Sequence, residues 1–522
     1  MDLRSQPATA ESLPAERSSP LDGLPAANRR PPVALLLLIL IGLYAYPAHL
    51  LMRPMLDADI WWHLRTGEWI VENHGVPRTD RFSSYGMDKD YVAYSWLYEL
   101  AFYKLYQWLG LTGLLLFRLV TCGVVLVAIH RFVLRREPRF WWATGLTALA
   151  FVALTNVLYE RSWMASILFG LVTLEVVLRL RDGSAGRAVW LLPLVFALWV
   201  NLHVQFIHGL ALLGLACAAP VGDALLKRPT SGRWADTFGS PAWKRLVALT
   251  AACALATLAN PYFVHYYSVV LTYSTQKVPY LVENEFKSLS FRDYPDWAFL
   301  ALALAGAVAL GRRLARVSLF EVLLFAGAAF LSFRVRRDVW LLVFVSLALC
   351  TGGPSPALKQ APQFALSWLR CAVVAVAVVV FAAFLGVRRN LSERGLADAV
   401  KERYPADAVA HIRDQRYAGP LFNEYDWGGY LIWALREYPV SMDGRVNNIL
   451  SDDRLARHTN TVRGIEWEKD EDLMKAGVVL LRKKDSPLPS ALRLHPRFKD
   501  HVMYEDDLAV VFVPSGDDRG GR

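Results

Sequence analysis

Residues 56–69 read Leu56-Asp57-Ala58-Asp59-Ile60-Trp61-Trp62-His63-Leu64-Arg65-Thr66-Gly67-Glu68-Trp69, and they follow the first long apolar run of the chain. Two acids at the start, a histidine and three tryptophans therefore stand where a membrane helix would emerge into water. Indole rings have an apolar face and a polar edge, so they favour the membrane–water interface. The stretch predicts a helix lying flat in that interface, with its first carboxylates held just above the bilayer.

Apolar runs dominate the rest of the chain. The protein has 522 residues, of which 54% are hydrophobic, and about 20 apolar residues suffice to span a bilayer. We expect about eleven membrane spans, at residues 33–52, 111–130, 140–158, 161–179, 188–201, 205–225, 244–259, 296–310, 317–333, 339–352 and 368–387. The sequence thus predicts a polytopic α-helical membrane protein.

Basic residues indicate its orientation. With the N-terminus inside, the clusters Arg131, Arg135, Arg136 and Arg139, Arg179, Arg181 and Arg187, Lys227, Arg228 and Arg233, and Arg312, Arg313 and Arg316 all fall in cytoplasmic loops. This agrees with the positive-inside rule. An odd number of spans then places the C-terminal part outside the membrane.

Three parts follow from this topology. We expect a disordered cytoplasmic tail over residues 1–30, a transmembrane domain over 31–389 with a first outer loop at 53–110, and an extracytoplasmic domain over 390–522. Within the loop, residues 59–73 and 95–109 are predicted interfacial helices. The last part alternates β-type runs at 477–481 and 508–513 with helical stretches such as 396–400. This pattern predicts a small α/β domain with its own core.

Composition excludes several classes of function. The net charge of +10 comes with no basic face or nucleic-acid motif, so we expect no nucleic-acid partner. The five cysteines lie in apolar runs without CxxC spacing, which disfavours a disulfide framework or a zinc site. No Walker loop, nucleophile elbow or dinucleotide fingerprint is present, so we expect no nucleotide cofactor.

The first candidate site is Asp57 and Asp59 with His63. Two carboxylates at i and i+2 can share a divalent cation or divide the roles of base and metal ligand. A helix starting at Asp59 would place His63 one turn later on the same face, where it could contact a substrate. The alternative is that Asp59 is only the N-cap of this helix and His63 is interfacial.

The second candidate is Arg334, Arg336 and Arg337, in a loop that the topology places outside. Arginines on the unexpected side of a membrane need an anionic partner, and a phosphate headgroup suits bidentate guanidinium contacts. The alternative is that this loop lies inside. Arg161 stands at another outer turn and is a weaker candidate for the same role, or pairs with Glu160.

Further polar residues lie near the outer ends of predicted spans. Asn201 and His203 would face protein or a water-filled cavity at that depth, as substrate contacts or as hydrogen bonds between helices. Glu285, in an outer loop, would line a cavity or be solvated. Residues 422–430 and 441–445 contain Asp-Trp-Gly-Gly-Tyr and Asp-Gly-Arg, which are typical of tight turns near strand ends, with a sugar-binding role as the alternative.

The order of parts resembles the GT-C class of membrane glycosyltransferases. That class, which includes protein mannosyltransferases, oligosaccharyltransferases and lipid A aminoarabinose transferases, has a first span, an outer loop opening with acids, two interfacial helices, many spans and an outer soluble domain. Residues 57–67, 199–203, 260–262, 422–430 and 443–445 also look like a bacterial group of multi-span proteins described as GT-C-like. The resemblance covers residues 33–515. One departure is that Ala58 separates the acids, which are often adjacent in the class.

The resemblance implies a glycosyltransferase of the bacterial inner membrane. Its donor would be a polyprenyl-phosphate-linked sugar, and its acceptor a hydroxyl of a glycan, lipid or protein on the outer face. Asp57 or Asp59 would act as general base or bind Mg²⁺ or Mn²⁺, while the arginines would neutralise the leaving phosphate. Two rival interpretations are a transporter or flippase for lipid-linked saccharides, which needs a polar path through the whole bilayer, and a non-catalytic membrane scaffold.

Overall fold

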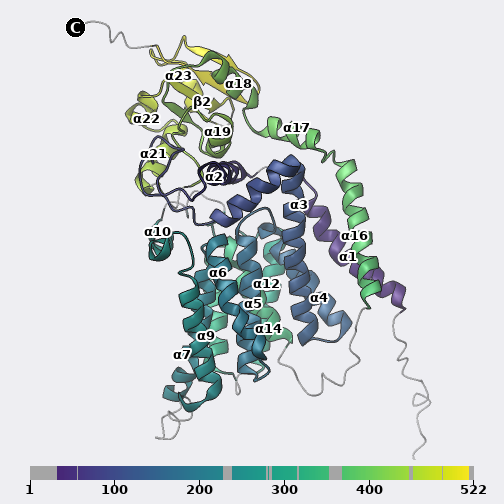
Figure 1. Ribbon diagram of the computed structural model, residues 1–522. Coiled ribbons are helices and arrows are strands. Elements are labelled where there is room, and N and C mark those ends of the chain that lie inside the picture. Colours follow the sequence, from purple (N-terminus) through teal and green to yellow (C-terminus); the bar gives the residue numbers. More distant parts are fainter. Residues whose placement is uncertain are drawn as a thin grey trace, which may run out of the picture.

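The computed structural model describes residues 32–55, 57–226, 238–277, 280, 285–313, 317–351, 367–445, 449, 451–484 and 486–515. The tail predicted over residues 1–30 lies outside these ranges. A bundle of apolar helices forms the larger part of the molecule, and a smaller unit with a β-sheet sits on one end of it (Figure 1).

Helices occupy every one of the expected apolar runs. They are α1 (Val33–Leu51), α3 (Trp96–Arg136), α4 (Phe140–Leu154), α5 (Trp163–Arg181), α6 (Leu192–Leu202), α7 (Phe206–Leu226), α9 (Pro241–Ala256), α12 (Tyr294–Gly311), α13 (Leu319–Arg334), α14 (Val339–Thr351) and α16 (Trp368–Arg388). Among the described residues, seven helical segments are long and apolar enough to cross a membrane: α1, α3, residues 140–157 including α4, α5, α7 to residue 225, α12 and α16. The chain is therefore a polytopic helical protein, and the number of eleven spans stays a prediction.

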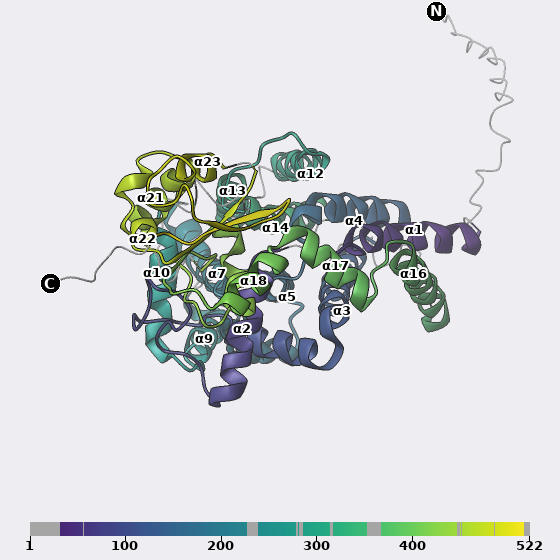
Figure 2. The ribbon, with the colours of Figure 1, turned by 90° about the horizontal axis from the view of Figure 1, so that it is seen from above.

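Helices at the edge of the bundle expose apolar side chains. Helices α1 and α16 pack together there, side by side in both views (Figures 1 and 2). On α16, Val376, Val379 and Val380 are more than 60% exposed. A helix that is apolar on all sides would expose apolar surface to water, whereas a bilayer covers that surface. This exposure therefore favours a position in the membrane.

A break at Gly110 divides α3 into the two parts that the sequence predicts. Gly110 has φ +61, a left-handed conformation that costs glycine little. The first part lies across the end of the bundle and the second runs down through it (Figure 1). Glu393, at the start of α17 (Glu393–Arg403), accepts hydrogen bonds from the backbone N–H groups of Leu111 and Thr112, both at 2.9 Å. The carboxylate thereby caps the N-terminus of the second part.

The smaller unit contains a four-stranded sheet in the order β1-β2-β4-β3. Strand β1 (Leu421–Asn423) is parallel to β2 (Val478–Arg482), while β4 (Ala509–Phe512) is antiparallel to both β2 and β3 (Val502–Glu505). Strands β2 and β4 are the two β-type runs of the sequence, and apolar clusters cover both faces. The helices of this unit are α17, α18 (Ala406–Gln415), α19 (Gly428–Ala434), α21 (Asp452–Val462), α22 (Glu471–Met474) and α23 (Leu488–Leu492).

Helix α2 (Asp59–Asn73) lies between the bundle and this unit (Figure 1). Trp61 and Trp62 are 4% and 3% exposed, and Trp61 meets the rings of Tyr404 and Tyr430 edge-on at 5.6 and 5.2 Å. The prediction that these tryptophans face the membrane interface is therefore wrong. The C-terminal unit covers them, because buried aromatic contacts remove more apolar surface from water than an interfacial position would.

Candidate active site

A polar cavity opens at the N-terminus of α2, where parts of the chain that are far apart in sequence meet. It is lined by Asp59, Trp62, His63, Tyr91, Tyr94, Arg161, Ser162, Trp163, His203, Tyr273, Glu285, Arg337, Gly444 and Arg445. The lining residues come from α2, the first outer loop, the turn before α5, the end of α6, α10 (Tyr267–Thr275), the loop that contains Glu285, the segment leading to α14 and the C-terminal unit. The cavity therefore exists only in the folded chain. Besides Asp59, the predicted site residues that line it are His63, Arg161, His203, Glu285 and Arg337.

Arg161 joins the two predicted acids. Its Nε donates to Asp57 Oδ2 at 2.7 Å, and its Nη1 donates to Asp59 Oδ2. Asp57 also accepts the backbone N–H of Asp59 through Oδ1 at 2.9 Å. The N-cap of α2 is Ala58, so the alternative that Asp59 is this cap is wrong. Arg161 does not pair with Glu160 either, because Glu160 binds Arg118 at 3.1 Å.

The electrostatics of this cluster follow from burial and opposite charges. Burial raises the pKa of the Asp59 carboxyl from 3.8 to about 6, and the guanidinium of Arg161 limits the rise. Burial by itself would lower the pKa of Arg161, but Asp57, Asp59 and Glu285 outweigh it and raise that pKa. The guanidinium of Arg161 therefore stays charged and is a fixed cation of the cavity.

The side chains of the three arginines in residues 334–337 lie in three different environments. Arg337 lines the cavity, where its Nη1 contacts Glu285 Oε1 at 3.4 Å and its guanidinium stacks on Phe286. Arg336 instead donates to Asp293 at 3.1 Å and contacts Asp296. Arg334 is exposed over the ring of Tyr280. Of the predicted phosphate ligands, Arg161 and Arg337 thus line the cavity, and Arg334 and Arg336 do not.

Of the predicted substrate contacts, some line the cavity and one does not. His63 and His203 line the cavity, and their Nδ1 atoms bond to Glu99 at 3.1 Å and to Ser166 at 2.8 Å. Asn201 instead accepts from Trp96 Nε1 at 2.7 Å and donates to the carbonyl oxygens of Ala197 and Ala259. Its amide ties α6 to α3 and to the end of α9, which is the helix-to-helix role that the sequence left open.

The C-terminal unit contributes a wall that the sequence suggested only as turns. Gly444 lies so close to Asp59 that a Cβ atom there would be 2.2 Å from Asp59 Oδ1. Arg445 is held by Asp443 at 2.8 Å and by Asp80 of the first outer loop at 2.7 Å. These ion pairs fix residues 443–445 over the cavity. Charge and turn propensity alone did not indicate this pairing, since 363 residues separate Asp80 from Asp443.

The donor set does not fit a metal centre. Both oxygens of Asp57 and one of Asp59 already bond to Arg161 or to the backbone. Within the described ranges, no group of three or more His, Cys, Asp or Glu side chains gathers that could hold a metal ion. Mg²⁺ and Ca²⁺ need several oxygen ligands around one point, and the cavity presents a guanidinium at that point instead.

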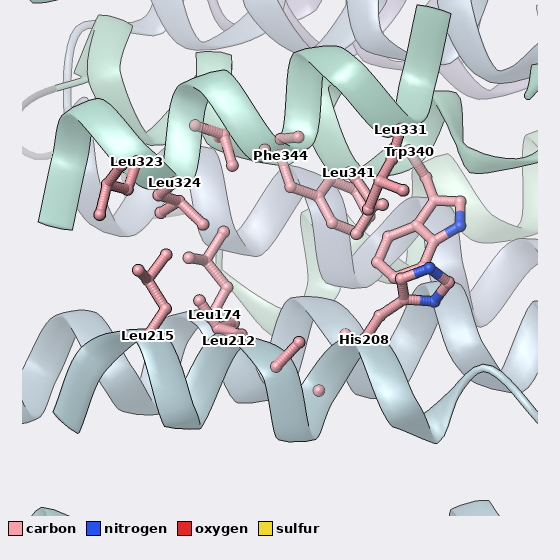
Figure 3. A pocket seen from close by; sticks show the side chains of 16 residues that line it. Leu174, His208, Leu212, Leu215, Leu323, Leu324, Leu331, Trp340, Leu341 and Phe344 are labelled. Atoms are coloured by element: carbon pink, nitrogen blue, oxygen red, sulfur yellow. The ribbon is translucent and has the colours of Figure 1, made fainter. Parts of the chain in front are cut away.

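A second, apolar cavity lies between α5, α7, α13 and α14, with about 680 Å³ of empty space that includes its open side (Figure 3). Leucines such as Leu215, Leu323 and Leu324 line one end, and His208 and Trp340 stand at the other (Figure 3). His208 Nε2 is 4.0 Å from Asp338, the residue next to Arg337. The apolar cavity therefore ends close to the arginine side of the polar cavity.

Comparisons with known proteins identify the fold. No protein-family model and no curated protein matches the sequence. The apo oligosaccharyltransferase of Archaeoglobus fulgidus aligns with a TM-score of 0.52 at 12% identity, over 86% of this chain and 69% of that one. ArnT of Cupriavidus metallidurans, solved with undecaprenyl phosphate, aligns with a TM-score of 0.46 at 14% identity, over 94% and 99%. Arabinofuranosyltransferase AftD from mycobacteria aligns with a TM-score of 0.46 at 15% identity, over 92% and 40%.

These neighbours are GT-C-type glycosyltransferases. This chain has the GT-C-type fold, which confirms the resemblance to the GT-C class, while the likeness to the bacterial group stays a prediction.

Proposed function

We propose that this chain is a glycosyltransferase that moves a sugar from a polyprenyl-phosphate donor to an acceptor hydroxyl on the outer face of the bacterial inner membrane. One observation carries the proposal: Arg161 and Arg337, with the acids that hold them, converge in a cavity next to an apolar cavity. A polyprenyl phosphate combines an anionic head with a long apolar tail. The two cavities match these two parts.

The chemistry follows from the charges of the polar cavity. The acceptor oxygen attacks the anomeric carbon, and the bond from that carbon to the phosphate oxygen breaks. The electron pair stays on the phosphate oxygen, where Arg161 and Arg337 stabilise it. The acceptor proton passes to a base. Both predicted acids bond to Arg161, and of the two Asp59 lines the cavity.

The orientation of the chain supports an outer active site. Glu99 and Arg136 lie near opposite ends of α3, a helix of 41 residues. Glu99 contacts His63 of the polar cavity, whereas Arg136 belongs to a basic cluster that the positive-inside rule places in the cytoplasm. The polar cavity and the C-terminal unit are then extracytoplasmic.

The test uses the full-length protein in lipid nanodiscs with a panel of undecaprenyl-phosphate pentoses and hexoses and a cell-envelope extract as the source of acceptor. Mass spectrometry follows donor loss and release of undecaprenyl phosphate. We expect turnover by the wild type, equal in EDTA and in Mg²⁺ or Mn²⁺, and its loss in Asp59→Asn. Donor binding without turnover would contradict the proposal and favour the transporter. Restoration of an EDTA-treated sample by metal would contradict the arginine-centred site.

A further inference from the structure

A buried acid–histidine pair lies beside the polar cavity. His63 Nδ1 is 3.1 Å from Glu99 Oε1, and the two side chains are 3% and 1% exposed. Gly67 makes this approach feasible, because a Cβ atom there would lie 2.2 Å from the carbonyl oxygen of Glu99. The helix carrying His63 therefore presses directly against the helix carrying Glu99, and the imidazole is also packed against Trp62 and Tyr98.

This arrangement leaves one ring nitrogen for chemistry. Since Nδ1 is bonded to Glu99, Nε2 remains, and within the part of the chain that the structure describes it has no hydrogen-bond partner. His63 lines the same cavity as Asp59 and Arg337. Burial raises the pKa of Glu99, and the charge of Arg445 opposes that rise. In the ionised state the Glu99 carboxylate can only accept, so Nδ1 carries the proton and Nε2 has a free lone pair.

The groups around His63 keep it in the form that a base requires. Burial is the main cause that lowers the pKa of His63, followed by the charges of Arg161, before α5, and His203, after α6. Asp59 lies one turn away on the same helix, Glu99 and Tyr98 face the ring from α3, and Arg445 lies near Glu99. The imidazole is therefore neutral at pH 7.

The acids of the cavity are less available for this role. The two oxygens of Asp57 and Oδ2 of Asp59 are bonded as described above, and both side chains hold Arg161. Burial keeps the pKa of Asp59 at about 6 despite Arg161, so geometry is what limits Asp59 as a base, because its Oδ2 is already bonded to that guanidinium. The free lone pair of His63 Nε2 has no such competitor.

We propose that His63, oriented by Glu99, accepts the proton of the acceptor hydroxyl, while Asp57 and Asp59 hold Arg161 against the donor phosphate. This inference rests on the glycosyl transfer proposed above. As the acceptor oxygen bonds to the anomeric carbon, its proton moves to Nε2 and the phosphate oxygen takes the electron pair of the broken bond. The imidazolium that forms donates Nδ1–H to Glu99, which stabilises it. His63 is then the catalytic base and Glu99 its positioning residue.

The experiment measures kcat and KM for the undecaprenyl-phosphate sugar that the wild type turns over, from about pH 5 to about pH 9. His63→Asn keeps an amide that can donate to Glu99 but removes Nε2. We expect kcat to fall roughly 10²- to 10⁴-fold with little change in KM. The matched control is His130→Asn, a buried histidine that pairs with Tyr44 away from the cavity, and it should behave as the wild type.

Two further variants distinguish a catalytic role of His63 from a purely structural one. In His63→Ala, added imidazole should restore part of kcat. In Glu99→Gln, the neutral amide no longer stabilises the imidazolium, so the rising limb of the kcat–pH profile should move to lower pH. A purely structural histidine would give neither result.

The outcomes distinguish the two proposals. A wild type inert with every donor would overturn the transferase and the base together. An active wild type whose His63→Asn variant keeps its kcat and its pH profile would overturn the base alone.

Discussion

At the scale of single residues, two arginines organise the site, and the sequence identified them only as candidates among several. Arg161 and Arg337 share Glu285 between them, with Arg161 Nη2 at 4.0 Å and Arg337 Nη1 at 3.4 Å. A phosphate entering the cavity would replace these carboxylate contacts by stronger bidentate ones. We therefore propose that the two arginines bind phosphate as a pair, whereas Arg334 lies outside the cavity.

Replacing one member of this pair should weaken donor binding. We expect Arg337→Gln to raise the Kd for undecaprenyl phosphate by roughly tenfold or more, because a charge-assisted bond contributes about 1.5–3 kcal/mol. Arg334→Gln removes an exposed arginine of the same segment and is the control, with an expected change below about twofold. Binding is measured by native mass spectrometry in nanodiscs. Equal effects of the two substitutions would show that Arg337 has no special role.

Glu424 is a second residue whose environment predicts a measurable effect. Burial raises its pKa from 4.5 to about 7, although the backbone N–H of Arg482 bonds to the carboxyl. The unfolded chain ionises this group near its ordinary pKa, so folding stability falls as the pH rises toward 7 and stays low above it.

The isosteric Glu424→Gln substitution should remove this loss. Above pH 7 we expect it to stabilise the protein by up to about 3 kcal/mol, and near pH 4 to have little effect. Thermal unfolding at the two pH values measures the difference, with the exposed Glu402→Gln as control. A variant less stable than the wild type at pH 8 would contradict the argument.

At the scale of elements, the bend in α3 couples the membrane bundle to the C-terminal unit. Gly110 supplies the conformation and Glu393 supplies the cap, although 282 residues separate Leu111 from this carboxylate. The helix end would otherwise have unpaired N–H groups. The cap therefore fixes where α17 meets the bundle.

Removing the cap should loosen that junction. We expect Glu393→Ala to cost about 1 kcal/mol, the usual value of a lost cap, and to lower the melting temperature by roughly 1–2 °C in a chain of this size. Glu402→Ala removes a solvent-exposed acid from the same helix and is the matched control. Identical melting curves for both variants would rule out a structural role for the cap.

At the scale of the whole molecule, a buried ion cluster holds the C-terminal unit over the cavity. Arg445, Asp443 and Asp80 are 1% or less exposed in their side chains, and Tyr85 donates to Asp443 at 3.0 Å. Breaking a buried ion pair leaves a charge without compensation, which costs about 3–5 kcal/mol. Docking therefore depends on all members of the cluster.

Arg445→Met should release the unit and abolish turnover, because the wall formed by residues 443–445 is lost. Limited proteolysis is expected to cut near residues 389–394 in this variant, but not in Arg493→Gln, whose partially exposed ion pair with Glu505 contributes at most about 1 kcal/mol. Adding Asp80→Asn and Asp443→Asn to Arg445→Met removes the stranded charges and should restore protection. Continued cleavage of the triple variant would show that the unpaired charges are not what releases the C-terminal unit.

The sequence by itself determined the helical architecture, the two strands β2 and β4, and the importance of the segment around Asp59. Long apolar runs and the short continuous apolar runs of β2 and β4 carry this information locally, because a segment that is apolar on every side must leave water whatever surrounds it. The break at Gly110 was visible for the same reason, as a boundary between a polar helix and an apolar one.

Only the tertiary structure decided which polar residues belong together. Arg161 and Arg337 reach the cavity, whereas Arg334, Arg336 and Asn201 do not, and nothing in the spacing of residues 334–337 distinguishes one arginine from the next. An indole fits the membrane interface as well as a core, so the sequence around Asp59 does not by itself show that Trp61 and Trp62 are buried. The C-terminal unit that buries them is about 350 residues away in sequence, and ion pairing and aromatic packing at that separation are settled by the fold alone.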